Sequence, residues 1–468
     1  MTRKSKAVHE QQSELFQILP ETTQQASRKS RQERHNPRGN KVEAKDRPFH
    51  EWYRFVLSFP PHLVRTYIEK FSMGNTATLL DPFCGCGTTL VEGKLANLKT
   101  VGLEANPFAH FASSIKTNWE INPKGLAENA QEIAHRTLSQ LKQQGLNDTG
   151  FLSDLPSNMA LRTLPEDELK LLLANSISPL PLHKSLVLLE NINKIGHKQF
   201  RGHELLAFSK AVVFIISNLH FGPEVGIGTV KTDVPVVLSW MQEIDSIVKD
   251  LVTVSRKKYP ASTVLLADAR SVSEHLPAGS VDLVITSPPY PNEKDYTRTT
   301  RLESVLLGFI HDRTELRLLK SNLIRSNTRN VYKNDDDDLW IAGHKEIQRI
   351  SQAIEKRRIE LNKDSGFETL YGRVTKLYFG GMARHLSSLS KVLKPGAKLA
   401  YVVGDQASYL RVMIKTGQLL SEISEVLGYK VIGLDLFRTR FASATKEQMR
   451  EEVLLLEWPN RKVSGNGK

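Results

Sequence analysis

The chain has 468 residues, of which 40% are hydrophobic and 25% are charged, a composition that excludes a wholly disordered or fibrous protein. Its 64 Lys and Arg against 51 Asp and Glu give a net charge of +13, which favours a polyanionic partner such as nucleic acid. The two cysteines exclude a disulfide framework. We expect a cytoplasmic protein that does not span a membrane, because the chain has no long apolar run and no secretory signal.

A polar, basic segment opens the chain. Residues 1–47 contain 11 Lys and Arg against 6 Asp and Glu, with few apolar residues. A segment of this composition buries too little apolar surface to fold by itself, so we expect a basic disordered tail. The tail either contacts phosphates or is simply solvated, and its sequence favours neither reading.

A strand, a turn, a helix and a second strand follow the tail. Apolar residues at three- and four-residue steps predict a helix from about Leu63 to Phe71. A short apolar run then ends at Asp81, and after a glycine-rich turn and a helix a second run ends at Glu104. This order of elements is one unit of a Rossmann-like α/β sheet.

The strands that should come next are delayed by a long interval. The third and fourth strands end near Asp268 and Ser287, and the intervening residues 118–258 are rich in helical patterns. A second interval, 301–372, is polar and basic: from 298 to 333 there are eight Lys and Arg against three Asp and Glu. We expect this basic stretch to help to grip nucleic acid.

The alternation of helices and strands resumes near residue 373 and supplies the last strands of the same sheet. The predicted division is a basic disordered tail (1–47), a catalytic domain (48–117, 259–300 and 373–460), a helical insertion (118–258) and a basic insertion (301–372), the last a possible target-recognition region.

The turn after the first strand is the first motif with chemical content. Glycines let the backbone approach a ligand closely, and the next helix offers free N–H groups. The candidate cofactor-binding residues of this turn are Asp81, Pro82, Phe83, Gly85, Gly87 and Thr88. The glycine spacing is not the dinucleotide pattern G-x-G-x-x-G.

Acidic residues end three successive strands. Glu104 can accept both ribose hydroxyls of a nucleoside, Asp81 suits a cationic amine, and Asp268 can accept a bond from an adenine amino group. Ribose together with ammonium favours S-adenosylmethionine over NAD as the cofactor. Each acid taken alone is equally consistent with a helix cap or a turn residue.

The second motif is Ser287-Pro288-Pro289-Tyr290, at the carboxyl end of the fourth strand. An exocyclic amino group on a base is a poor nucleophile, because its lone pair is delocalised into the ring. The Ser287 hydroxyl and the Pro288 carbonyl can hold its two N–H bonds and aim the lone pair, while Tyr290 offers a stacking face to an extruded base. The alternative is a proline-rich turn without a catalytic role.

The two cysteines, Cys84 and Cys86, lie inside the first motif. They have no Cys or His partners at metal-ligand spacing, so we predict small loop fillers and no metal site. A cytosine carbon-5 methylase needs a thiolate nucleophile, and these thiols are not beside the proline pair. Transfer of a methyl group to carbon 5 of cytosine is therefore not expected.

Together the two motifs resemble the amino-group DNA methyltransferases, which methylate N4 of cytosine or N6 of adenine. Residues 81–89 resemble the cofactor loop of that family and Ser287 to Tyr290 its catalytic tetrapeptide. The segment around Pro60 resembles the stretch beside the methionine end of the cofactor, and the segment around Asn106 resembles the one that holds ribose and covers adenine. The spacing departs from the family, because 118–258 separates the second and third strands.

The resemblance implies a class I methyltransferase sheet, S-adenosylmethionine as cofactor and double-stranded DNA as substrate, acting at the nucleoid with or without a restriction endonuclease partner. Serine at the first position of the tetrapeptide is more typical of cytosine-N4 enzymes, so we favour N4 of cytosine, with N6 of adenine as the alternative. Methylation of an RNA base or of protein glutamine, and an inactive DNA-binding protein, are further alternatives. Either insertion is a candidate for reading the DNA sequence.

Overall fold

The structure is a computed structural model that describes residues 42–55, 58–150, 160–222, 224–292, 294–442 and 447–460. Most of the predicted basic tail, residues 1–41, therefore lies outside the described residues. None of the helices in the described part is long and apolar enough to cross a membrane.

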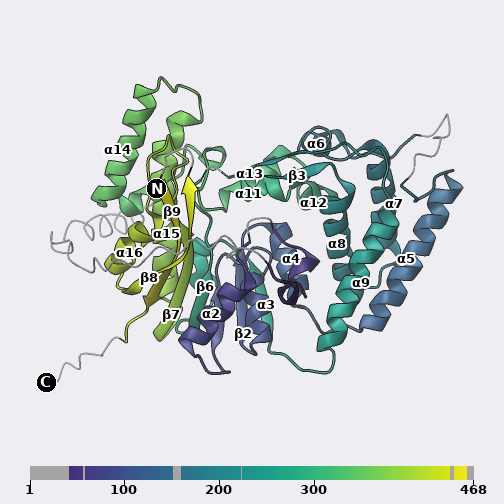
Figure 1. Ribbon diagram of the computed structural model, residues 1–468, viewed down its shortest axis with the longest axis horizontal. Helices are drawn as coiled ribbons and strands as arrows, with labels where there is room; N and C mark the ends of the chain where they lie inside the picture. Colours follow the sequence, from purple (N-terminus) through teal and green to yellow (C-terminus); the bar gives the residue numbers. More distant parts are fainter. Residues whose placement is uncertain are drawn as a thin grey trace.

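A mostly parallel sheet forms the centre of the catalytic half (Figure 1). Its strands are β1 (Thr78–Asp81), β2 (Lys99–Glu104), β5 (Ser262–Leu266), β6 (Val281–Thr286), β7 (Leu393–Gly404), β8 (Lys430–Ala442) and β9 (Glu447–Glu457). Within the described ranges the sheet has seven strands in the order β5-β2-β1-β6-β7-β9-β8. The first five pair in parallel, and β9 is antiparallel to both β7 and β8. This is the Rossmann-like α/β sheet that the sequence predicted.

Helices cover both faces of the sheet and also form a separate body. They are α2 (Pro61–Phe71), α3 (Thr88–Leu95), α4 (Pro107–Thr117), α5 (Pro123–Gln143), α6 (Glu166–Leu169), α7 (Pro179–Ile195), α8 (Lys198–Ala211), α9 (Val236–Val254), α10 (Val272–His275), α11 (Tyr296–Thr299), α12 (Arg301–Leu306), α13 (Arg313–Ser321), α14 (Lys345–Glu360), α15 (Tyr371–Ser390) and α16 (Thr416–Val426). Short single-turn helices are η2 (Ala44–Asp46), η3 (His50–Trp52), η5 (Ala269–Ser271), η6 (Thr328–Asn330), η7 (Asp337–Ile341) and η8 (Glu368–Leu370).

Alternation along the strands places successive side chains on opposite faces of the sheet. Leu79 and Ile285 face one side and pack with α2. Leu80 and Val284 face the other side and pack with α15 and α16. Both faces are therefore buried, which explains why the central strands are almost continuously apolar.

In the helical insertion α5, α7, α8 and α9 pack around one hydrophobic core, to the right of the sheet in Figure 1. This core continues into Trp52, Cys86 and Phe108 of the predicted catalytic domain. The apolar stripe predicted after Pro235 is the buried face of α9, with Trp240 completely buried. The apolar stretch after Leu205 is not one helix: α8 continues into a π-helical turn, η4 (Val212–Ile216), and a small hairpin follows, β3 (Leu219–Phe221) and β4 (Val225–Ile227). That hairpin was not predicted.

A buried ion pair ties the insertion together. The Lys184 ammonium on α7 lies 2.6 Å from Asp233 Oδ1 and 3.7 Å from Asp148 Oδ1. The side chains of Lys184 and Asp233 are 0% and 1% exposed. Asp148 also accepts the backbone N–H groups of Val236 and Val237, each at 2.8 Å, and so caps α9.

The basic interval 301–372 is divided between the two halves. Leu302 and Val305 of α12 pack in the core of the helical insertion, whereas Ile324 and Ile347 pack in the core of the sheet. Arg325, expected among the residues that grip nucleic acid, is 4% exposed and pairs with Asp335 at 2.8 Å. This arginine therefore stabilises the fold and is not available to a phosphate.

Candidate functional site

A cavity of about 590 Å³ lies at the carboxyl ends of β1, β2, β5 and β6. The predicted residues in its wall are Pro82, Phe83, Gly85, Thr88, Glu104, Asn106, Asp268, Ser287, Pro288, Pro289 and Tyr290. Three other predicted residues, Asp81, Gly87 and Pro60, do not line it. In the described part of the helical insertion no residue from 118 to 258 belongs to this wall.

The turn between β1 and α3 requires its glycines. Gly85 has φ +52° and Gly87 has φ +84°, the left-handed region in which side chains are strained. A Cβ on Gly87 would also lie 3.0 Å from Ser113 Cβ. Gly87 therefore shapes the loop from behind, while the Gly85 backbone forms part of the cavity wall.

Glu104, at the end of β2, is held by two backbone donors. Gly85 N donates to Glu104 Oε2 and Asn106 N donates to Glu104 Oε1, each at 2.8 Å. Burial raises the pKa of Glu104 to about 7, against the lowering effect of these two hydrogen bonds. Each carboxylate oxygen keeps a further lone pair, so a ligand with two neighbouring hydroxyls fits this position.

Asp81 lies behind the wall, not in it. The carboxylate is completely buried and accepts hydrogen bonds from Thr286 Oγ1 at 2.6 Å and Phe83 N at 3.1 Å. Its Oδ2 has no hydrogen-bond partner among the described residues, and burial raises its pKa to about 6. Asp81 thus joins β1 to β6 and fixes the loop, and its negative charge acts on the cavity from behind.

Asp268 follows β5 and is oriented by an arginine. Arg270 approaches it in a fork, with Nε at 2.9 Å and Nη2 at 2.6 Å from Oδ2. The Asp268 carboxylate also accepts Arg270 N at 2.9 Å and so caps η5. Asp268 therefore caps η5 and also lines the cavity, and its bond to an adenine amino group stays a prediction.

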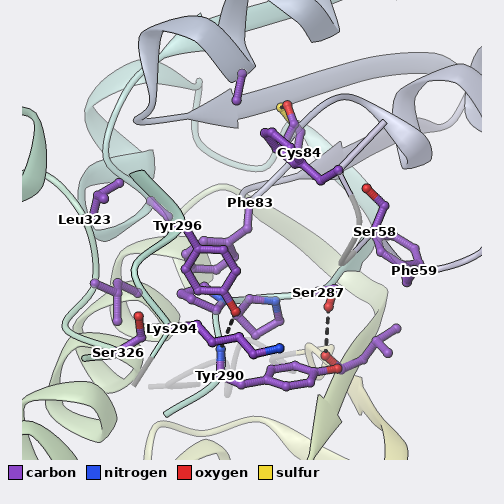
Figure 2. Close-up of a pocket in the computed structure, with 18 of the residues that line it drawn as sticks. Ser58, Phe59, Phe83, Cys84, Ser287, Tyr290, Lys294, Tyr296, Leu323 and Ser326 are labelled. Atoms are coloured by element: carbon purple, nitrogen blue, oxygen red, sulfur yellow. Dashed lines mark hydrogen bonds between the residues drawn. The ribbon is translucent and has the colours of Figure 1, made fainter. Parts of the chain in front are cut away.

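The tetrapeptide leaves β6 and enters the cavity. Ser287 Oγ donates to Val402 O at 3.4 Å, and Tyr290 N donates to the Tyr296 hydroxyl at 3.5 Å. Figure 2 shows Ser287, Tyr290, Lys294 and Tyr296 gathered on one side of the cavity, with Ser58 and Cys84 on the other.

The Tyr290 ring packs against the end of β7. A Cβ on Gly404 would lie 3.3 Å from Tyr290 Cε2 and 3.2 Å from Glu451 Cγ, so only glycine admits both neighbours without a shift. Burial, and then the Glu451 charge, raises the pKa of the Tyr290 phenol above its ordinary value. Tyr290 is therefore a neutral ring at physiological pH.

Several wall residues were not predicted individually. Phe55, Ser58 and Phe59 belong to the segment before α2 in which only Pro60 was singled out, and Lys294 and Tyr296 come just after the tetrapeptide. Proximity in the chain to Ser287–Tyr290 is the signal that could have pointed to the last two. Arg438 and Glu451 face each other across β8 and β9, with Nη2 and Oε1 2.8 Å apart. Their strands read only as sheet, so no sequence signal marked them.

The two cysteines are buried in the loop between β1 and α3, and both line the cavity. Cys86 Sγ lies 3.5 Å from Ser58 Oγ, and Cys84 Sγ lies 3.8 Å from Ser113 Oγ. Burial, reinforced by the Glu104 charge, raises the pKa of the Cys84 thiol well above its usual range. Cys84 is therefore a neutral thiol that fills space beside Gly102.

Comparisons with known proteins find similar sequences among DNA methyltransferases. Residues 1–113 match the sequence profile of the family N6_N4_Mtase, described as DNA methylase. The chain is 25% identical over 454 residues to the type II methyltransferase M.BsoBI of Geobacillus stearothermophilus, which covers 89% of this chain and 86% of that relative. It is 24% identical over 416 residues to the type II methyltransferase M.AvaI of Nostoc sp., covering 83% and 80%. Among solved structures, TrmN from Thermus thermophilus aligns with 11% identity and a TM-score of 0.29, over 88% of this chain and 53% of that one.

Proposed function

We propose that the chain is an amino-group (N6/N4) DNA methylase that methylates N4 of cytosine in duplex DNA. The family match over residues 1–113 and the distant homology to the type II methyltransferases M.BsoBI and M.AvaI support this proposal. The observation that carries the proposal is the serine-type tetrapeptide at the end of β6, lining the same cavity as the Glu104 carboxylate. A hydroxyl, not a carboxylate, occupies the first catalytic position.

The cavity residues fit S-adenosylmethionine, which supplies the methyl group as a sulfonium when bound. Glu104 is held so that its free lone pairs can accept two ribose hydroxyls, and Asp268 is available to an adenine amino group. Asp81 adds an unpaired buried oxygen behind the loop, whose negative charge favours a cationic ligand. The other proposed cofactor residues are Pro60, Pro82, Phe83, Gly85, Gly87, Thr88 and Asn106.

The target amino group is activated by orientation. The Ser287 hydroxyl and the Pro288 carbonyl accept its two N–H bonds, which draws the nitrogen lone pair out of conjugation with the ring. Pro289 and Pro288 fix the shape of the loop, and Tyr290 stacks on the extruded base. Ser287 need not be a strong base, because the amino protons become acidic once the nitrogen shares its lone pair with the methyl carbon.

Duplex DNA is the partner under this proposal, and the enzyme works at the nucleoid in the cytoplasm. The catalytic domain comprises 48–117, 259–300 and 373–460, and the insertions 118–258 and 301–372 contact DNA outside the target base. The relatives are type II methyltransferases, which supports pairing with a restriction endonuclease.

The test is chemical identification of the product. Purified protein is incubated with S-adenosylmethionine and DNA from a host that lacks the chain, with RNA and the Ser287→Ala variant as matched controls. The DNA is then digested to nucleosides and analysed by mass spectrometry. N4-methylcytosine is expected. N6-methyladenine would overturn the base and keep the mechanism, whereas 5-methylcytosine, or methylation of RNA alone, would overturn the proposal.

A further inference from the structure

A second cavity, of about 210 Å³, lies beside the first and has the opposite charge. Its wall contains four cationic side chains, Arg298, Arg301, Lys320 and Arg329, and one carboxylate, Asp295. Four positive charges against one negative give a formal charge of +3 in this wall. A wall of this charge selects an anion.

The carboxylate neutralises only one of the four cations. Asp295 Oδ2 lies 2.6 Å from Lys320 Nζ. Arg301 donates to Thr297 Oγ1 at 2.9 Å and to Leu171 O at 3.3 Å, and no carboxylate of the described chain lies within ion-pair distance of it. Burial lowers the pKa of Arg301, so its positive charge is held at an electrostatic cost that an anion would relieve.

The other two arginines are accessible from solvent and weakly paired. Arg298 Nη1 is 3.7 Å from Glu224 Oε2, and both side chains are partly exposed, at 32% and 58%. Arg329 is exposed and lies over the Phe367 ring at 5.8 Å from its centroid. Their guanidinium groups can therefore reach a ligand at the mouth of the cavity.

The two cavities share their dividing wall. On α11 and its cap, Tyr296 and Thr299 line the first cavity, whereas Asp295 and Arg298 line the second. At the end of α13, Asn322 lines the first cavity and Lys320 the second, and in η6 Asn330 lines the first and Arg329 the second. Single chain segments therefore separate the two cavities.

We propose that the second cavity binds the DNA backbone phosphate next to the flipped target nucleotide. The inference rests on the proposed DNA methyltransferase function, because a base that enters the first cavity brings its phosphates to the shared wall. Arginine forks match the geometry of phosphate oxygens, and a phosphodiester carries its charge at every physiological pH. The helical insertion adds Leu171 to Leu173, Ser176 and Leu219 to the wall of this cavity. Arg298, Arg301 and Arg329 thus act as positioning residues that hold the strand while the base is extruded.

The first test measures how DNA affinity depends on salt. The probe is a duplex that carries the methylation site mapped in host DNA, and the variants are Arg301→Gln, Arg298→Gln and Arg329→Gln. The matched control is Arg357→Gln on α14, an arginine of 44% side-chain exposure that pairs with Glu360 and belongs to neither cavity wall. Loss of one phosphate contact should weaken binding about tenfold at low salt and reduce the slope of log Kd against log salt by about one, relative to the wild type and the control. Affinity for S-adenosylmethionine should stay unchanged.

The second test asks whether the arginines act on one particular phosphate. Single neutral methylphosphonates are placed in turn at each phosphate flanking the target base. The wild type should lose affinity at one position, and the arginine variants should lose no further affinity there, because the interaction is already gone. Arg298→Gln and Arg329→Gln keep the test decisive if Arg301→Gln fails to fold.

Additive losses at every position, or an unaltered salt slope, would overturn the phosphate site. If inorganic phosphate binds at the arginines but no methylphosphonate is coupled to them, the cavity binds a free anion. That result would also overturn the DNA phosphate site. If the wild-type protein methylates DNA but shows no coupling, only this inference is overturned. If the wild-type protein transfers no methyl group to DNA, the proposed function itself is overturned.

Discussion

The two cavities lie on either side of one chain segment and have opposite chemistry. The wall of the first includes Glu104, Asp268 and Glu451 against Lys294 and Arg438, a formal charge of −1 from three negative and two positive groups among the described residues. The wall of the second carries +3. The strand ends of the sheet contribute to the first cavity, whereas the described residues of the helical insertion contribute to the second cavity and not to the first.

The difference shows how two adjoining cavities of opposite charge can suit different parts of one ligand. Carboxylates held by backbone N–H groups at strand ends suit a cationic cofactor, and arginines with few carboxylates suit a phosphate. A flipped nucleotide has both an aromatic base and an anionic backbone, so it can occupy both cavities at once. The cations that would hold the phosphate come from residues 298–329, whereas the described part of the helical insertion adds leucines and Ser176 to the same wall.

The largest expected effect tests whether the insertion folds independently of the catalytic cavity. Lys184→Met removes the ammonium of the buried pair and leaves Asp233 with an uncompensated charge. We expect the free energy of unfolding to fall by about 3–5 kcal/mol, measured by chemical denaturation. Affinity for S-adenosylmethionine below the transition should not change, because residues 118–258 line no part of the first cavity within the described chain.

Lys194→Met on the same helix is the matched control, because its ammonium is 68% exposed and pairs with Glu190 at the surface. Its effect should stay below about 1 kcal/mol. A folded Lys184→Met protein that has lost cofactor affinity would break the separation between the two regions.

The sheet could be predicted because its signals are local. Short apolar runs ending in Asp81, Glu104 and Ser287 each mark a strand followed by a turn, and parallel strands bring those ends to one edge. The positions that differ from expectation depend on contacts between distant residues. Asp81 is drawn behind the wall by Thr286, which is 205 residues away, and Arg325 is buried by Asp335.

The insertions were harder to interpret for the same physical reason. A helical pattern shows which face of a helix is buried but not which neighbour covers it. The sequence therefore did not show that α12 joins the core of the helical insertion while Ile347 joins the core of the sheet. Nor did it show that Arg298 and Arg329 converge on one cavity, because the chain between them folds into α12 and α13.

The next effect in size is on the transfer step in the first cavity. Ser287→Ala removes one of the two acceptors for the target amino group, so the lone pair is less well aimed. We expect kcat to fall by about a hundredfold to a thousandfold, while the Kd for S-adenosylmethionine and the salt slope of DNA binding do not change. Single-turnover kinetics with saturating DNA measures the step directly. Unchanged kcat would remove Ser287 from the mechanism and with it the main argument for cytosine.

A smaller effect concerns the proton on Glu104. In the free protein the pKa of Glu104 is about 7, and a cationic cofactor favours the ionised form. Affinity for S-adenosylmethionine should therefore rise about tenfold between about pH 6 and about pH 8, with proton release detectable by calorimetry in two buffers. The stability of the free protein changes with pH in the opposite direction. Its free energy of unfolding should fall as pH rises from 4.5 towards 7, because the unfolded chain loses this proton first.

Glu104→Gln should weaken cofactor binding about tenfold to a hundredfold and remove most of this pH dependence. Glu451→Gln is the control, because this carboxylate lines the same cavity but pairs with Arg438. It lies on β9, which β1, β6 and β7 separate from the strand that carries Glu104. It should keep the pH dependence of the wild type. If both variants respond to pH like the wild type, Glu104 is not the group that couples to the cofactor.

The smallest expected effect separates capture of the base from capture of the phosphate. Tyr290→Ala removes a neutral ring in the first cavity, and a base–aromatic stack is worth about 1–3 kcal/mol. We expect the KM for duplex DNA to rise about tenfold, with the salt slope unchanged because no phosphate contact is lost. Tyr290→Phe keeps the ring and should bind DNA like the wild type, which distinguishes stacking from a hydrogen bond of the hydroxyl. The arginine variants of the second cavity should give the converse result, with a reduced salt slope. If Tyr290→Ala also reduced the slope, the two cavities would not act on separate parts of the nucleotide. The division between a first cavity that selects the base and a second cavity that holds the strand would then fail.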